Sequence, residues 1–115
     1  MNLRIGARHL ELTDALRGYV EDKIGRLERY EPRAIDAHVE LAHDTSRPGQ
    51  EFVARVSFAV PGPDLHAEQS CSDMYAAIDG VADKLERMIR KRQTRRQAKR
   101  VKGGAAFKAE QQRGG

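Results

Sequence analysis

The sequence predicts an α+β fold: a two-layer sandwich with the element order β-α-β-β-β-α, in which two helices cover one face of a four-stranded sheet. Two observations support this prediction. Apolar and polar residues alternate in four short segments, as in strands with one wet face, and apolar residues recur at helical spacing in two longer segments. Each element therefore has one apolar face, and the helices and the sheet bury these faces against each other.

The first strand is predicted at residues 2–8, and its apolar face is formed by Leu3, Ile5 and Ala7. Thr13 then has the side chain of a helix N-cap, and Asp14 stands in the first turn, where the helix dipole favours a negative charge. Pro32 ends this helix near Arg29 or Tyr30. The residues at helical spacing that form its apolar face are Leu16, Tyr19, Val20, Ile24 and Leu27.

Three further strands follow, separated by clusters of turn residues at 45–49 and 61–64. They are predicted at residues 35–41, 52–60 and 65–70. Because a helix connects the first two strands, we expect these two strands to be parallel. The apolar face of the second strand is formed by Ile35, Ala37, Val39 and Leu41.

Ser72 or Asp73 is expected to cap a second helix, whose apolar face is formed by Ile78, Val81, Leu85, Met88 and Ile89. Gly80 lies inside this helix, where it either costs about 1 kcal/mol relative to alanine or allows close packing on the sheet. The apolar stripe ends at Ile89, and the next core-facing positions are Arg92 and Arg96. The helix therefore either ends near Arg92 or projects past the body as a basic rod.

The formal net charge of +4 hides an asymmetry along the chain. Residues 84–102 carry ten basic side chains and one acidic side chain, whereas residues 1–83 carry nine basic and fifteen acidic ones. An acidic body with a basic arm should meet a polyanion with the arm, although a charge run can also be a merely solvated helix end. We therefore divide the chain into an α+β domain at 1–95 and a basic, then Gly-rich, flexible tail at 96–115.

Basic residues also recur on single flanks of the two predicted helices. Arg26 and Arg29 share a flank of the first helix, and Lys23 lies at its apolar edge. One flank of the second helix holds Lys84, Arg87, Lys91 and Arg95. Because both helices must cover the same sheet face, we expect the two basic flanks to form one groove that fits a phosphate backbone.

No pattern in the sequence indicates catalysis, a metal or a cofactor. His9, His38, His43 and His66 lack metal-ligand spacing, the acidic residues are scattered, and no phosphate-binding glycine loop is present. A small enzyme using Cys71 or a histidine is an alternative without a motif behind it. Tyr19, Met74 and Tyr75 are either core residues or base-stacking residues. The single cysteine, the absence of a signal peptide and the absence of an apolar run near ~20 residues predict a cytoplasmic protein that does not act at a membrane.

The stretch Asp73-Met74-Tyr75-Ala76-Ala77-Ile78-Asp79-Gly80 resembles the ribosome hibernation-promoting factor and ribosome-associated inhibitor family. The segments at 12–17, 22–28, 65–67 and 81–87 fit the same family pattern, so that the resemblance covers residues 1 to about 95. It implies the β-α-β-β-β-α fold, which is similar to double-stranded RNA-binding domains.

The resemblance further implies a stress-response factor, active in stationary phase, that binds rRNA of the small ribosomal subunit. Such proteins occupy the mRNA and tRNA channel near the decoding centre, block translation and promote inactive, paired ribosomes. The rRNA-binding residues that the family pattern implies are Lys23, Arg26, Arg29, Lys84, Arg87 and Lys91. Charge alone adds Arg90, Arg92 and Arg95.

The long family form carries a C-terminal dimerisation domain, which we do not expect in a sequence that ends at Gly115. The resemblance therefore implies a monomeric short form that works with a separate small ribosome modulation factor. The basic tail favours the hibernation-promoting branch over the inhibitor branch. A general double-stranded RNA-binding protein with a basic arm is the alternative function.

Overall fold

A computed structural model describes residues 1–104 of the chain, with side chains through Thr94. Its elements follow the predicted β-α-β-β-β-α order, with a short 3-10 helix, η1, added after the first helix. Their bounds are β1 Asn2–Arg8, α1 Asp14–Gly25, η1 Arg26–Arg29, β2 Asp36–His43, β3 Phe52–Ala59, β4 Leu65–Cys71 and α2 Met74–Gly104.

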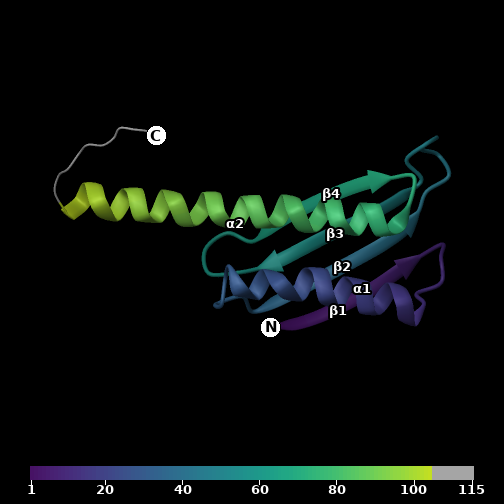
Figure 1. Ribbon diagram of the computed structural model, residues 1–115, viewed down its shortest axis with the longest axis horizontal. Helices are drawn as coiled ribbons and strands as arrows, with labels where there is room; N and C mark the ends of the chain where they lie inside the picture. The colour runs from purple at the N-terminus through teal and green to yellow at the C-terminus, as the bar shows by residue number, and fades with distance from the viewer. Residues whose placement is uncertain (105–115) are drawn as a thin grey trace.

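The four strands form one sheet in the order β1-β2-β3-β4. β1 runs parallel to β2, as predicted, and the other two pairs are antiparallel. Both helices lie on the same side of the sheet, with α2 over β3 and β4 and α1 beside it (Figure 1). The opposite face of the sheet carries no helix within the described part of the chain (Figure 1).

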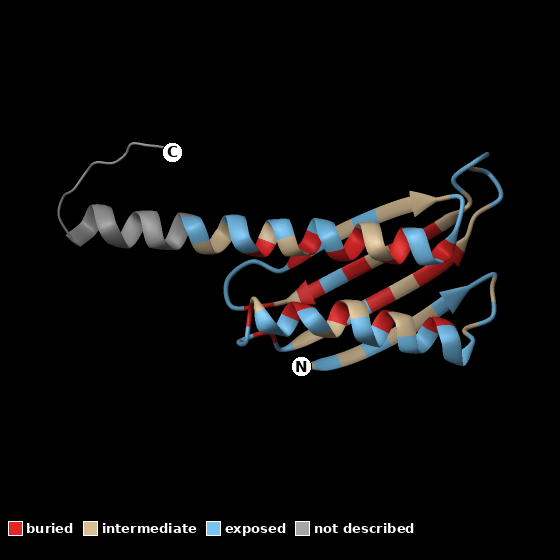
Figure 2. Cartoon of the chain, viewed as in Figure 1, coloured by how far each residue is buried: buried red, intermediate tan, exposed pale blue. Residues whose placement is uncertain are grey.

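The core lies between the two layers, where the buried positions of the helices and strands face each other (Figure 2). The apolar faces predicted for the helices are buried at Leu16, Val20, Ile24, Leu27, Ile78, Val81, Leu85 and Ile89. The sheet contributes Ala37, Val39, Leu41, Ala54, Val56, Phe58 and Leu65. The predicted alternation thus identified the core face of each strand.

Both predicted helix starts are confirmed by their hydrogen bonds. The Oγ1 atom of Thr13 accepts from the backbone N–H of Leu16 at 3.1 Å. At the second helix Asp73 is the cap, because its Oδ2 atom accepts from the N–H of Ala76 at 3.0 Å. Each cap satisfies a backbone donor that has no partner inside the helix.

Gly80 allows α2 to lie close to β4, which confirms one of the two predicted roles. A Cβ atom at this position would stand 2.6 Å from Cγ of Gln69 on β4. Since real Cβ atoms do not approach other carbons so closely, any larger residue at position 80 would displace the Gln69 side chain or the helix. The glycine therefore leaves room for the Gln69 side chain between α2 and β4.

Two apolar residues predicted for the core faces are exposed at the ends of strands. Ile35 precedes β2 and is 60% exposed, and Ala7 near the end of β1 is exposed as well. The backbone of Ile35 already pairs with Ala59 and Asn2, but its side chain lies in solvent. The first helix also differs from its prediction, because it narrows to the 3-10 turn η1 at Arg26–Arg29 before it ends.

The backbone of α2 is helical through Gly104, so the second predicted alternative, a helix that projects past the body, is correct (Figure 1). The side chains from Arg95 onward and all of residues 105–115, which include most of the predicted flexible tail, lie outside what the structure describes. Within the described residues, no helix has an apolar stretch long enough to cross a bilayer.

Candidate nucleic-acid interface

The basic residues of α2 predicted from the family pattern line a groove on the side of α2 that faces away from α1. This β4-edge groove is lined by His66, Ala67, Glu68, Lys84, Arg87, Met88 and Lys91. Positions 84, 87 and 91 share one flank because they are three or four residues apart on the helix. β4 is the last strand of the sheet, so the groove follows an outer edge of the molecule.

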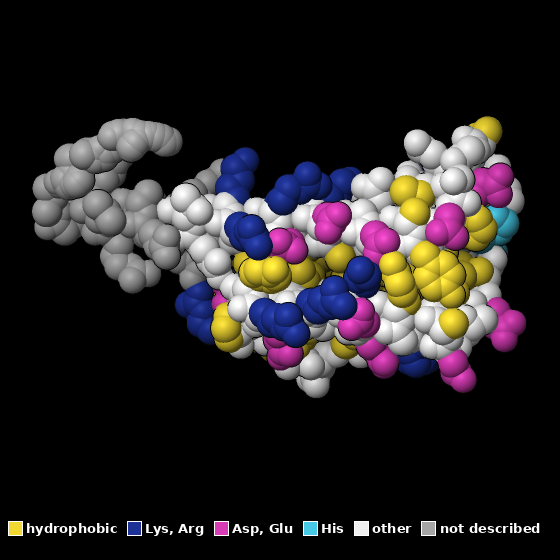
Figure 3. Space-filling view, in the orientation of Figure 1, with side chains coloured by type: hydrophobic (Ala, Val, Ile, Leu, Met, Phe, Trp, Pro, Cys, Tyr) yellow, Lys and Arg dark blue, Asp and Glu magenta, His cyan; other side chains and the backbone are white. Residues whose placement is uncertain are grey.

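The basic residues of α1 and η1 line a different groove, between the two helices. This inter-helix groove is lined by Lys23, Arg26, Leu27, Arg29, Tyr30, Ala82, Asp83 and Glu86. The flank of α2 that faces α1 is thus acidic at Asp83 and Glu86. Figure 3 shows the result as basic side chains on both helices with acidic side chains between them.

The prediction that the two basic flanks form one groove is therefore wrong. Lys84, Arg87 and Lys91 line the flank of α2 toward β4, whereas Asp83 and Glu86 line the flank toward α1. At 3.6 residues per turn, the mean directions of the two sets lie roughly 100° apart around the helix axis. The body of α2 separates the two sets of cations. The same helical projection that groups the basic residues also groups acidic residues on a flank at residues 79, 83 and 86.

In the inter-helix groove, most cations have carboxylate partners. Lys23 Nζ lies 3.4 Å from Oδ1 of Asp79, and Arg26 Nη2 lies 3.1 Å from Oδ2 of Asp22. Arg29 is exposed and forms no ion pair with the described residues. The positive charge of this groove is thus largely offset before any ligand arrives.

Arg90 also belongs to this side of α2. Its guanidinium lies 2.9 Å from Oε2 of Glu86 and stands 5.0 Å from the centre of the Tyr30 ring. Arg90 was added to the predicted site from charge alone. The structure places it with the inter-helix groove and not with Arg87 and Lys91.

A tyrosine pair joins α1 to the start of α2. The Tyr19 hydroxyl donates to Oδ1 of Asp79 at 2.6 Å, and its ring meets that of Tyr75 edge-on at 4.9 Å. The hydrogen bond to Asp79, followed by burial and by the negative charges of Asp79, Asp22 and Asp73, raises the pKa of Tyr19 to about 12. Tyr19 is therefore a structural contact.

The other two candidates for base stacking differ in exposure. Met74 is 5% exposed and belongs to the core, whereas Tyr75 is 38% exposed. Of the three residues named for stacking or core packing, Tyr75 alone presents a ring at the surface.

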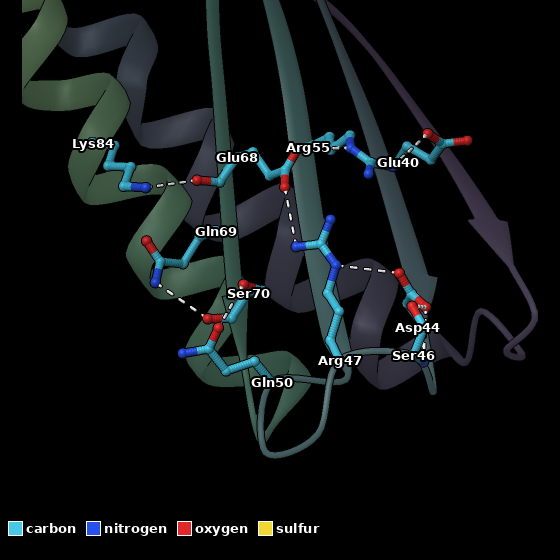
Figure 4. A network of polar contacts seen from close by, with 10 residues as sticks. All are labelled: Glu40, Asp44, Ser46, Arg47, Gln50, Arg55, Glu68, Gln69, Ser70 and Lys84. Atoms are coloured by element: carbon cyan, nitrogen blue, oxygen red, sulfur yellow. Dashed lines mark hydrogen bonds and ion pairs between the residues drawn. The ribbon is translucent and has the colours of Figure 1, made fainter.

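In the β4-edge groove, Lys84 is already bound to the protein. Its Nζ atom donates to the backbone carbonyl of Glu68 at 2.7 Å, which satisfies an outward-facing acceptor of the edge strand (Figure 4). Arg87 and Lys91 are exposed and form no ion pair with any residue that the structure describes. These two cations are available to an external anion.

The acidic residue in the β4-edge groove, Glu68, is held by two arginines of the sheet and its hairpin. Arg55 Nε donates to its Oε1 atom at 2.9 Å, and Arg47 Nη1 donates to its Oε2 atom at 3.4 Å (Figure 4). The hydrogen bond from Arg55 holds the pKa of Glu68 below its usual range, against an opposing effect of burial. The carboxylate therefore remains ionised but is neutralised by these partners.

Arg92 contacts the backbone of the α+β body. Its Nη1 atom donates to the carbonyl of Pro61 at 3.4 Å, in the connection between β3 and β4. Beside it, the Gln93 side chain donates to the carbonyl of Tyr30. Arg92 thus anchors α2 to the body, and its predicted contact with rRNA remains a prediction. The side chain of Arg95 lies outside the described residues.

The histidines and the cysteine form no catalytic or metal-binding arrangement in the described part of the chain. No group of three or more potential metal ligands occurs there. His38 and His66 lie on the open face of the sheet, as predicted, and His43 pairs with Glu51 at 3.0 Å. The thiol of Cys71 is half-buried, 3.7 Å from Nε2 of Gln69.

Comparison with known proteins adds the family. A family model described as "Sigma 54 modulation protein / S30EA ribosomal protein" matches residues 3–97. The chain is 40% identical over 101 residues to the ribosome hibernation promotion factor of Deinococcus radiodurans, covering 87% of this chain and 53% of that protein. It is 40% identical over 89 residues to the ribosome hibernation promoting factor of Azotobacter vinelandii, covering 77% of this chain and 79% of that protein.

A solved structure agrees with this result. The crystal structure of the N-terminal domain of Thermus thermophilus Protein Y matches with a TM-score of 0.69 at 35% sequence identity, over 79% of this chain and 98% of that chain. This chain spans about half the length of the Deinococcus relative.

Proposed function

Since this chain belongs to the Sigma 54 modulation protein / S30EA ribosomal protein family, we propose that it is a ribosome hibernation factor. The proposal is that it binds rRNA of the small ribosomal subunit in the channel used by mRNA and tRNA near the decoding centre. It blocks translation there and promotes inactive, paired ribosomes under stress. The names of the Deinococcus and Azotobacter relatives, both ribosome hibernation factors, support this assignment.

The observation that carries the proposal is the β4-edge groove. Arg87 and Lys91 stand there without ion pairs among the described residues, and the nearby carboxylate of Glu68 is already held by Arg55 and Arg47. Free guanidinium and ammonium groups at helical spacing suit the phosphates of an RNA backbone. The inter-helix groove supplies Arg29 and the partly offset Lys23 and Arg26 as a second contact surface.

The mechanism is occlusion, with no chemical step and no cofactor. Cations on both sides of α2 neutralise rRNA phosphates, and the α+β domain at 1–95 fills space that mRNA and tRNA need. Recognition of structured RNA rests mainly on shape and backbone contacts. The pairing of ribosomes is assigned to a separate small modulation factor, with this chain acting as a monomer.

A competition experiment tests this function. The full chain is mixed with purified small subunits and sedimented. Duplex RNA is added in increasing amounts, up to the phosphate concentration that the rRNA of the subunits provides. We expect the chain to remain with the subunits, to inhibit translation in a reconstituted system, and to dissociate steeply as salt rises. Displacement by an equal phosphate concentration of duplex would instead identify a general double-stranded RNA-binding protein.

A further inference from the structure

The open face of the sheet carries a row of four polar residues, one from each strand. The strand register places Arg4 opposite His38, His38 opposite Ser57, and Ser57 opposite His66. All four side chains are exposed, and Nδ1 of His66 lies 3.1 Å from Oγ of Ser57. We refer to these four residues as the histidine row.

In the neighbouring row on the same face, the acidic side chains are paired with arginines. It consists of Gly6, Glu40, Arg55 and Glu68. Glu40 lies 2.8 Å from Arg8 and 3.7 Å from Arg55, and Glu68 is held by Arg55 and Arg47 (Figure 4). The carboxylates nearest to the histidine row on this side are therefore already neutralised by arginines.

On its other side, the histidine row borders a row with one charged member. That row contains Asn2, Asp36 and Ala59, and Asp36 is half-buried two residues before His38 on the same face. Arg4 forms no ion pair with the described residues. Asp36 is thus a carboxylate beside the histidine row that forms no ion pair with the described arginines and lysines.

The histidine row is continuous with the β4-edge groove. His66 is the last member of the row, and it also lines that groove together with Arg87 and Lys91. A surface that can accept negative charge therefore runs from the outer flank of α2, over the edge strand β4, and across the sheet to Arg4 on β1.

We propose that a single-stranded RNA segment held in the β4-edge groove continues over β4 and lays its phosphates along the histidine row. This inference rests on the proposed function, because it extends the same RNA-binding surface. Three intervals of about 4.8 Å between neighbouring strands give the row a length of roughly 14 Å. Arg4 and the imidazoles of His38 and His66 contact the phosphates, while the hydroxyl of Ser57 orients the ring of His66.

The inference predicts that binding is stronger at acidic pH. An imidazole that contacts a phosphate is favoured in its protonated form, so RNA binding through the row takes up protons and strengthens as pH falls. The charged groups that face the two histidines are Arg4 on β1, Asp36 and Glu40 on β2, Arg55 on β3, Glu68 on β4, and Arg87 and Lys91 on α2.

Two oligouridylates test the inference on the full chain. One is short enough to occupy only the β4-edge groove, and the other is longer by the nucleotides needed to cover the additional 14 Å or so of the row. In the variant His38→Gln, whose residue lies on the row but outside the β4-edge groove, we expect the long oligomer to bind about threefold more weakly at about pH 6, and the short oligomer to bind as to wild type. The gain in affinity for the long oligomer between about pH 8 and about pH 6 should also shrink.

His9→Asn serves as the matched control, because His9 is exposed, lies off the row and has the positive φ of 61° that asparagine tolerates. Arg87→Gln with Lys91→Gln should weaken both oligomers. Equal effects of the histidine variant on both oligomers, or none on either, would overturn the row. If the wild-type chain did not bind small subunits but bound the two oligomers as expected, the proposed function would be refuted and the histidine row would still be supported as an RNA contact.

Discussion

Three predicted RNA-binding cations line each of the two grooves beside α2, but the grooves differ in what surrounds these cations. In the inter-helix groove, Asp83 and Glu86 line the same surface as the cations, and Lys23 and Arg26 have carboxylate partners. In the β4-edge groove, Glu68 is the carboxylate among the described lining residues, and arginines of the sheet hold it.

This difference shows that a count of basic residues does not rank two surfaces. A phosphate is attracted by the charge that remains after internal pairing, and exposed pairs that already exist must be broken or shared. Among the described residues, Arg87 and Lys91 have no carboxylate partner, whereas Lys23 and Arg26 each form an ion pair. We therefore expect the β4-edge groove to dominate the affinity and the inter-helix groove to contribute less.

Charge reversal on each side tests that ranking and should give the largest effect. Arg87→Glu with Lys91→Glu should weaken subunit binding about a hundredfold, because two charge-assisted contacts are lost. Arg26→Glu with Arg29→Glu should weaken it only about tenfold, since part of that charge is already offset. Binding titrations at several salt concentrations measure both.

Lys84 is left unchanged in that experiment, because its ammonium holds the backbone of Glu68 and its loss would mix stability with binding. Circular dichroism and denaturant unfolding of the two variants should show that both remain folded. Equal losses for the two double variants would contradict the ranking of the grooves.

The difference between the two grooves can also be reduced by removing the carboxylates of the inter-helix groove. Asp83→Asn with Glu86→Gln removes the acidic flank of the inter-helix groove and releases Arg90 from its partner. RNA affinity should rise about fivefold, because less negative charge faces the phosphates. The control is Glu11→Gln with Glu21→Gln, which changes the net charge equally at exposed positions outside both grooves. If the control gives the same increase, net charge rather than position is responsible.

The smallest effect is expected at alkaline pH, where the tyrosine contact between α1 and α2 should weaken. The pKa of Tyr19 is raised to about 12, whereas an unfolded tyrosine has a pKa of about 10. The contribution of the hydroxyl to stability is therefore fully present below pH ~10 and is lost as pH rises toward 12.

Denaturant unfolding at several pH values measures this contribution. In Tyr19→Phe, stability at neutral pH should fall, and the part of the alkaline decline that Tyr19 causes should vanish. Tyr75→Phe is the control, because the Tyr75 ring remains in contact with Tyr19 while its hydroxyl is removed. An unchanged decline in Tyr19→Phe would show that the hydrogen bond to Asp79 does not stabilise the junction of the helices.

The sequence was sufficient for the fold and for most of its local detail. Alternation in the strands and helical spacing at Leu16 to Leu27 involve residues that are near in sequence, so they predicted the buried faces. Thr13 was recognisable as a cap for the same reason, whereas the sequence left the second cap open between Ser72 and Asp73. Ile35 was misplaced because alternation does not tell how far the helical layer extends over a strand end.

The arrangement of the site was harder to predict from the sequence than the fold. A helical projection groups Lys84, Arg87 and Lys91, but it does not say whether their flank faces the other helix or the sheet edge. That depends on strand order and on the side of α2 on which α1 lies. The contact of Arg92 with Pro61 depends on the path of the β3–β4 connection, which no local pattern encodes.

The two hydrogen bonds at Arg92 and Gln93 have a mechanical consequence. α2 contains 31 residues, which at about 1.5 Å per residue makes it about 46 Å long, and these bonds lie where it leaves the body. The projecting part of α2 is thus held at one end only, by hydrogen bonds to Pro61 on one side and to Tyr30 on the other. A force on its far end becomes a torque on the β3–β4 connection at Pro61 and on Tyr30, which lines the inter-helix groove.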